Sequence, residues 1–177
     1  TYTFRQIGGY AHGTFKDVTD KQAEEIKEHK KVKAAGERIV AGIIAEDAFA
    51  RVPAEVSYMD ENNTKWSYID LKEGREPEGK KEIILDEAAL ELLGVTPELG
   101  AEITLTYQVS DKKQNGGVRT DTFTLVGWWE YDPVMPVHYI NVSRAYMEQL
   151  ERDVTGEGLE PFRRDLNVML SSSLDID

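Results

Sequence analysis

Apolar and polar residues alternate at the start of the chain. Residues 1–7 follow a two-residue period, which is typical of a half-buried β-strand. Thr19 is followed at the third helical position by Gln22, the pattern of a capping box, so a helix is predicted from there to residue 31. Residues 32–44 are apolar and rich in β-branched side chains, which favours a second strand.

The central part of the chain has a mostly β pattern. Strands are predicted over residues 54–59, 65–71, 82–86, 101–109 and 118–128. Asp86 is placed to cap one short helix over residues 88–93, and Gly94 stands where a left-handed residue would end that helix. The pattern therefore predicts that the central residues form a β-rich lobe.

The last part of the chain mirrors the first. Residues 137–142 alternate as a strand, and Ser143 is placed to cap a helix. Tyr146, Met147 and Leu150 form the apolar side of that helix, and residues 166–170 predict a final strand.

Both ends thus predict a strand, a helix and a strand. Two such units can form a split β-α-β, ferredoxin-like lobe. We therefore predict an α+β domain in which residues 1–50 and 135–177 form that α/β lobe. Residues 51–134 would form a β-rich lobe inserted into it.

Composition narrows the classes of function. The chain has 177 residues, with 33 acidic against 21 basic residues and a net charge of −12. That balance argues against a nucleic-acid surface and against docking on anionic lipid headgroups. Cysteine is absent, so neither disulfides nor thiolate metal sites are expected.

Catalytic and metal-binding patterns are not found in the sequence. His12, His29 and His138 are far apart, without the spacing that places two imidazoles on one helical face. There is no nucleophile elbow, Walker A motif or dinucleotide-binding glycine pattern. We therefore predict no catalytic residues, no metal, no cofactor and no enzyme activity.

One segment has the composition of a contact surface. Trp128, Trp129, Tyr131 and Met135 gather in a proline-stiffened stretch, and aromatic residues with Met suit a protein interface. These four residues are the candidate partner-binding site. The alternative is structural: the segment would be a buried crossover between the two lobes, with one Trp in the core.

Residues 74–127 carry a resemblance to a known family through several short motifs in order. These are Gly74-Arg75-Glu76-Pro77, Glu82-Ile83-Ile84-Leu85-Asp86, the helix ending at Gly94, Gly100-Ala101-Glu102-Ile103-Thr104-Leu105 and Phe123-Thr124-Leu125-Val126-Gly127. The run resembles the extracytoplasmic core domain of MacB/FtsX-type ABC transporter permeases. The resemblance implies an α/β lobe near the membrane that carries an inserted β-rich lobe.

The resemblance also implies a location, partners and a mechanism. The domain would lie on the extracellular or periplasmic side of the cell membrane, with its transmembrane segments outside this sequence. A cytoplasmic ABC ATPase would hydrolyse ATP, a second permease copy could be present, and an extracytoplasmic protein, peptide or lipid would be the ligand. Pro53 and Pro133 are the candidate hinges between the lobes. The alternative function is a secreted or surface-anchored binding module, such as an adhesin or a solute-recognition domain.

Overall fold

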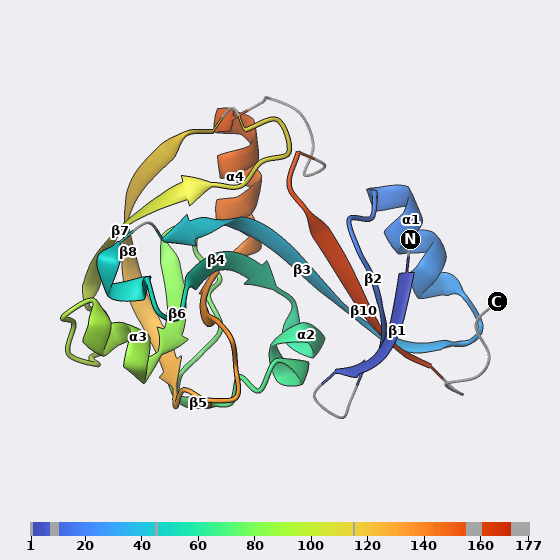
Figure 1. Ribbon diagram of the computed structural model, residues 1–177, viewed down its shortest axis with the longest axis horizontal. Coiled ribbons are helices and arrows are strands. Elements are labelled where there is room, and N and C mark those ends of the chain that lie inside the picture. Colours follow the sequence, from blue (N-terminus) through green and yellow to red (C-terminus); the bar gives the residue numbers. More distant parts are fainter. Residues whose placement is uncertain (1, 8–10, 45, 115, 155–160, 171–177) are drawn as a thin grey trace. The chain divides into compact units, whose positions relative to one another are not determined.

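The computed structural model describes residues 2–7, 11–44, 46–114, 116–154 and 161–170 (Figure 1). It divides into two compact units. Unit 1 consists of Thr1–Ile39, Met59–Ile69 and Arg163–Asp177, and unit 2 of Val40–Tyr58 and Asp70–Phe162. Both units are built around β-strands with helices packed on them, so the predicted α+β class is confirmed.

Unit 1 contains a sheet made by both ends of the chain. Its strand order is β1 (Tyr2–Ile7), β2 (Ala11–Phe15), β10 (Arg164–Leu170) and the first part of β3 (Val32–Ile44). Each neighbouring pair is antiparallel. Helix α1 (Asp20–Glu28) connects β2 to β3, and β10 lies between these two strands. This arrangement is one split β-α-β unit.

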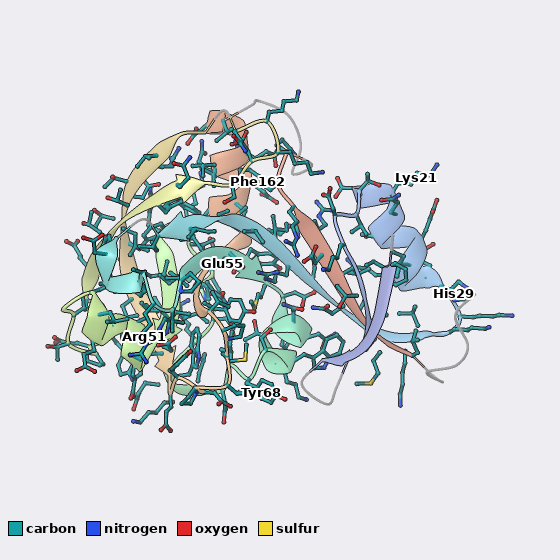
Figure 2. The ribbon with its side chains drawn as sticks, viewed as in Figure 1. Lys21, His29, Arg51, Glu55, Tyr68 and Phe162 are labelled. Atoms are coloured by element: carbon teal, nitrogen blue, oxygen red, sulfur yellow. The ribbon has the colours of Figure 1, made fainter. Side chains whose placement is uncertain are left out.

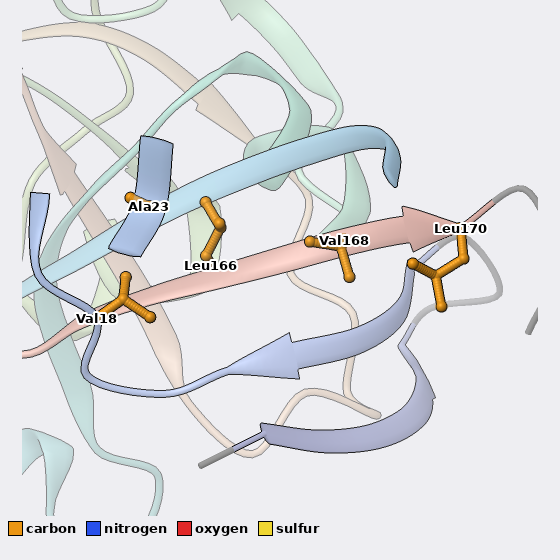
Figure 3. Close-up of a cluster of buried hydrophobic side chains, with 5 residues drawn as sticks. All are labelled: Val18, Ala23, Leu166, Val168 and Leu170. Carbon is orange, nitrogen blue, oxygen red and sulfur yellow. The ribbon is translucent and has the colours of Figure 1, made fainter. Parts of the chain in front are cut away.

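Helix α1 begins at the predicted capping box. The Thr19 hydroxyl accepts a hydrogen bond from the Gln22 amide at 3.2 Å, and the Gln22 side chain accepts one from the Thr19 amide at 2.9 Å. The helix buries Ala23 against alternate residues of β10 and against the segment that precedes the helix (Figure 3). The buried cluster consists of Val18, Ala23, Leu166, Val168 and Leu170.

The strand predicted over residues 65–71 is wrong. Residues Glu61–Trp66 form helix α2, and only the short strand β5 (Leu71–Gly74) follows. Asp60 explains the difference, because one carboxylate oxygen accepts from the Asn63 amide at 2.9 Å and caps the helix. Its other oxygen accepts from the Glu37 amide at 2.8 Å, which ties α2 to β3.

Unit 2 contains strands that close on themselves. Going around the ring, the strands are the end of β3, β4 (Ala54–Met59), β9 (His138–Val142), β6 (Glu82–Asp86), β8 (Val118–Trp129) and β7 (Glu102–Val109). Strand β7 pairs with β8 on one side and with Gly42–Ile44 of β3 on the other, which completes the ring. Two pairs are parallel, β4 with β9 and β6 with β8.

Unit 2 also contains β5, which pairs with β8, the 3₁₀ turn η1 (Asp47–Phe49), helix α3 (Glu87–Leu92) and helix α4 (Arg144–Val154). The Ser143 hydroxyl accepts from the Tyr146 amide at 3.0 Å and caps α4 as predicted. Tyr146, Met147 and Leu150 are buried, so the predicted apolar side of this helix is confirmed.

The two units differ from the predicted lobes in their boundaries. Strand β9 and helix α4 belong to unit 2, although they were predicted to join the chain ends in one α/β lobe. Their place follows from strand pairing, since β9 lies between β4 and β6. Within the described residues unit 1 therefore has one split β-α-β unit, and the complete ferredoxin-like lobe is not found.

Candidate functional site

The two tryptophans of the predicted partner-binding segment lie at the end of β8 in unit 2. Trp128 pairs with Leu85 of β6 on one side and with Glu73 of β5 on the other. The exposed fraction is 8% for Trp128 and 4% for Trp129, so both side chains are buried. This burial favours a structural role for the indoles, and it leaves the loop that follows them as the accessible part of the segment.

That loop contains a β-turn over residues 132–135, called the apolar turn below. The Met135 amide donates to the Asp132 carbonyl at 2.9 Å, and the Asp132 carboxylate accepts from the Val134 amide at 3.0 Å. The Tyr131 hydroxyl donates to the Met135 carbonyl. Val134 occupies the tip and is 73% exposed, whereas Tyr131 and Met135 are half-buried.

The buried side chain of His138 anchors the loop to neighbouring segments of unit 2. The ring centroid of His138 lies 4.3 Å from that of Tyr131 and 5.9 Å from that of Phe49, and the rings of His138 and Phe49 form a T-shaped pair. Its Nδ1 lies 2.8 Å from an oxygen of Asp86, and its amide donates to the Pro53 carbonyl at 2.8 Å. The end of the loop is therefore held in place by the contacts of His138 with Asp86, Phe49 and Pro53.

Asp86 serves two elements at once. One carboxylate oxygen faces His138, and the other accepts from the Ala89 amide at 2.7 Å, which makes Asp86 the predicted cap of α3. Burial raises the pKa of the Asp86 carboxyl above its ordinary value, although hydrogen bonds from His138 and the Ala89 amide oppose that effect. Spacing in the sequence gave no signal for the His138–Asp86 pair, because 52 residues separate its members.

A second polar cluster joins α4 to the β7–β8 hairpin. Tyr146 donates from its hydroxyl to Asp121 at 2.6 Å and also shares a hydrogen bond with the Tyr107 hydroxyl. Asp121 additionally accepts from Lys81 at 2.7 Å and from Arg119 at 2.8 Å. Arg119 also donates to Asp153 near the end of α4 at 2.9 Å.

Hydrogen bonding and burial shift the pKa values of two groups in this cluster in opposite directions. Burial alone would raise the pKa of Asp121, but hydrogen bonds from Arg119, Lys81 and Tyr146 outweigh it and lower the value to about 2. Burial raises the pKa of Tyr107 to about 12. At neutral pH the cluster thus holds a carboxylate between cations beside neutral phenols, an arrangement suited to fixing α4 in place.

The two candidate hinges lie within unit 2. Pro53 precedes β4, and Pro133 belongs to the apolar turn. The chain passes from one unit to the other after Ile39, Tyr58, Ile69 and Phe162. Neither proline is at such a position, so the division of the chain does not place an inter-unit hinge at them.

The histidines lie in separate surroundings. His29 ends α1, where its side chain is exposed and its Nδ1 accepts from the Lys31 amide at 3.1 Å (Figure 2). His12 lies in β2, and its side chain is outside the described part of the structure. Among the described residues, no group of three or more His, Asp or Glu side chains could hold a metal ion. None of the helices in the described ranges is long and apolar enough to span a membrane.

Comparison with known proteins gives a match at the level of structure. No protein-family model matches the chain, and no curated protein matches its sequence. The fold is similar to the periplasmic region of MacB from Actinobacillus actinomycetemcomitans, with a TM-score of 0.53 and 14% identity. That match covers 92% of this chain and 68% of the other.

A second similar structure comes from Gram-positive bacteria. It is the extracellular domain of the noncanonic ABC-type transporter YknZ, with a TM-score of 0.53 and 15% identity. The match covers 88% of this chain and 74% of the other. The resemblance predicted from residues 74–127 to extracytoplasmic domains of MacB-like transporters is therefore confirmed for the fold.

Proposed function

We propose that the chain is an extracytoplasmic domain of an ABC transporter permease, on the outer side of the cell membrane. The observation that carries this proposal is the shared fold, which extends over 88–92% of the chain in the two transporter domains. At that coverage the likeness extends over most of the chain and is not confined to one short motif.

The domain would act by coupling rather than by catalysis. A separate cytoplasmic ATPase would hydrolyse ATP, and transmembrane segments outside this sequence would transmit its motion to the domain. The domain would then bind or signal to a partner outside the membrane during export. Tyr131, which precedes the apolar turn, and Met135, which closes it, would contribute to that contact, and the buried Trp128 and Trp129 would support the loop.

The location can be tested with single cysteines, because the chain has none of its own. In the full-length protein in intact cells, Val118→Cys should react with a membrane-impermeant maleimide, since Val118 is 63% exposed. Val56→Cys, at a fully buried position, is the matched control and should react only after denaturation. Labelling of Val118→Cys only in permeabilised cells would contradict an extracytoplasmic location.

The transporter assignment needs a second measurement, because a surface-anchored binding module would be labelled in the same way. Full-length protein purified in mild detergent should bring with it an ABC ATPase subunit, or contain that domain in its own chain. The adhesin or solute-recognition alternative predicts neither. A full-length protein that is labelled from outside but has no ATPase would favour the binding module.

A further inference from the structure

The apolar turn is ordered by the domain itself. Two hydrogen bonds to Asp132 shape it, one from the Met135 amide and one from the Val134 amide, and the Tyr131 hydroxyl bonds the Met135 carbonyl. The contact between the rings of Tyr131 and His138, tilted by 37°, fixes the base of the loop. A contact made by Val134 would therefore cost little conformational entropy, since hydrogen bonds within the loop already order its backbone.

The stretch of chain that contains the turn carries negative charge. Residues 120–143 contain no Lys or Arg, and the exposed acids Glu130 and Asp132 stand just before Val134. Lys72 is close enough to Glu130 for an electrostatic interaction, but its ammonium lies 2.9 Å from a carboxylate oxygen of Glu87. The turn thus presents an apolar tip with an acidic border.

Charge decides between two classes of partner. An anionic membrane surface attracts Lys and Arg near an inserted apolar residue, and the turn carries acids in their place. A pocket on a protein can instead combine apolar walls with a basic rim, which complements this surface in both respects.

We propose that the apolar turn inserts Val134 into an apolar pocket on a protein partner, and that Lys or Arg side chains at the rim of that pocket face Glu130 and Asp132. The inference rests on the proposed extracytoplasmic function and specifies the chemistry of its partner. The contact is small and rigid, so its strength depends on a few groups around one side chain.

The test uses a photoreactive amino acid in the full-length protein in cells. Placed at Val134, it should form an adduct with one protein, and mass spectrometry should locate the adduct in an apolar segment with neighbouring Lys or Arg. The same amino acid at Val118 is the control, because Val118 is 63% exposed in the same unit. Equal adducts at the two positions, a lipid adduct at Val134 or an acidic partner segment would overturn the proposal.

The charge requirement has its own matched variants. Asp132→Asn keeps the oxygen that accepts from the Val134 amide, and Glu130→Gln removes the other charge. Together they should lower the adduct yield at Val134 about tenfold, because steering by the rim charges is lost. Glu98→Gln with Glu102→Gln changes the net charge equally at other exposed positions and should leave the yield unchanged.

Equal losses in the two charge pairs, or no loss in either, would contradict the proposed basic rim. Failure of the proposed extracytoplasmic function would be seen in a different measurement, the cysteine labelling. If Val118→Cys is not labelled from outside the cell, the extracytoplasmic location fails. If it is labelled and no protein adduct forms at Val134, only the inference about the turn fails.

Discussion

Asp121 connects the stability of unit 2 to pH. Its pKa is held at about 2, against 3.8 for the same group free in solution, because three hydrogen bonds outweigh its burial. A lowered pKa stabilises the folded state above the unfolded value, and that stabilisation disappears as pH falls through the folded value. We expect about 2 kcal/mol of unfolding free energy to be lost from this group between about pH 4 and pH 2.

The check is a series of urea unfolding curves from pH 5 to pH 2 on the wild type and on Asp121→Asn. The wild type should lose more unfolding free energy than the variant over this range, because the variant has no carboxylate to protonate. Parallel pH profiles would show that Asp121 does not supply the difference.

His138 and Asp86 form a pair whose members should be coupled. The exposed fraction is 3% for His138 and 1% for Asp86, so His138→Phe would leave a buried carboxylate oxygen without its partner. We expect this change to cost about 3 kcal/mol of unfolding free energy. Asp86→Asn added to it should recover part of the loss, because Asn keeps an oxygen for the Ala89 amide without the charge.

Chemical unfolding of the two single variants and the double variant completes a thermodynamic cycle. Strictly additive losses would mean that the two side chains do not interact in the folded protein. A positive coupling of 1 kcal/mol or more, on the order expected for a buried charged hydrogen bond, would support the geometry described above.

Element by element, local signals in the sequence predicted most helices and strands. Thr19 and Gln22 marked the start of α1, and Asp86 marked the start of α3, because capping is a contact between near neighbours. The error over residues 65–71 has the same origin. The Asp60 carboxylate caps α2, and the residue types that cap a helix are also those that favour a turn between two strands.

Two glycines with left-handed backbones should respond differently to alanine. Gly74 has a φ of +86°, and a Cβ there would lie 1.9 Å from the Val126 carbonyl oxygen, so Gly74→Ala should cost at least about 3 kcal/mol. Gly94 has a φ of +72° with no atom within 4 Å of the same position, so Gly94→Ala should cost about 1 kcal/mol. Thermal unfolding of both variants gives the comparison, and similar losses would contradict it.

For the whole molecule, the sequence predicted the α+β class of the fold but not that the strands of unit 2 close into a ring. The ring in unit 2 depends on pairs such as Ser57 with Asn141, which are 84 residues apart and leave no periodic signal. Two features of the candidate site have no signal in the sequence for the same reason. Burial of Trp128 between β5 and β6, and the meeting of His138 with Asp86, follow from strands that become neighbours only in the folded chain.

The closed ring makes a prediction about truncation. A chain that stops before residue 138 lacks β9, so β4 and β6 lose the strand between them. We expect such a chain to show no cooperative thermal transition and no near-ultraviolet circular dichroism from buried aromatic rings. A cooperative transition with native-like aromatic signal would mean that unit 2 closes by another route.

The same pairing has a consequence for biosynthesis. Strand β4 is complete once residue 59 has been synthesised, but its partner β9 ends at residue 142. At a typical elongation rate of about 5–20 residues per second, the edge of β4 that β9 will cover waits unpaired for roughly 4–17 s. Slower elongation over this interval would prolong that exposure and favour aggregation of the nascent chain.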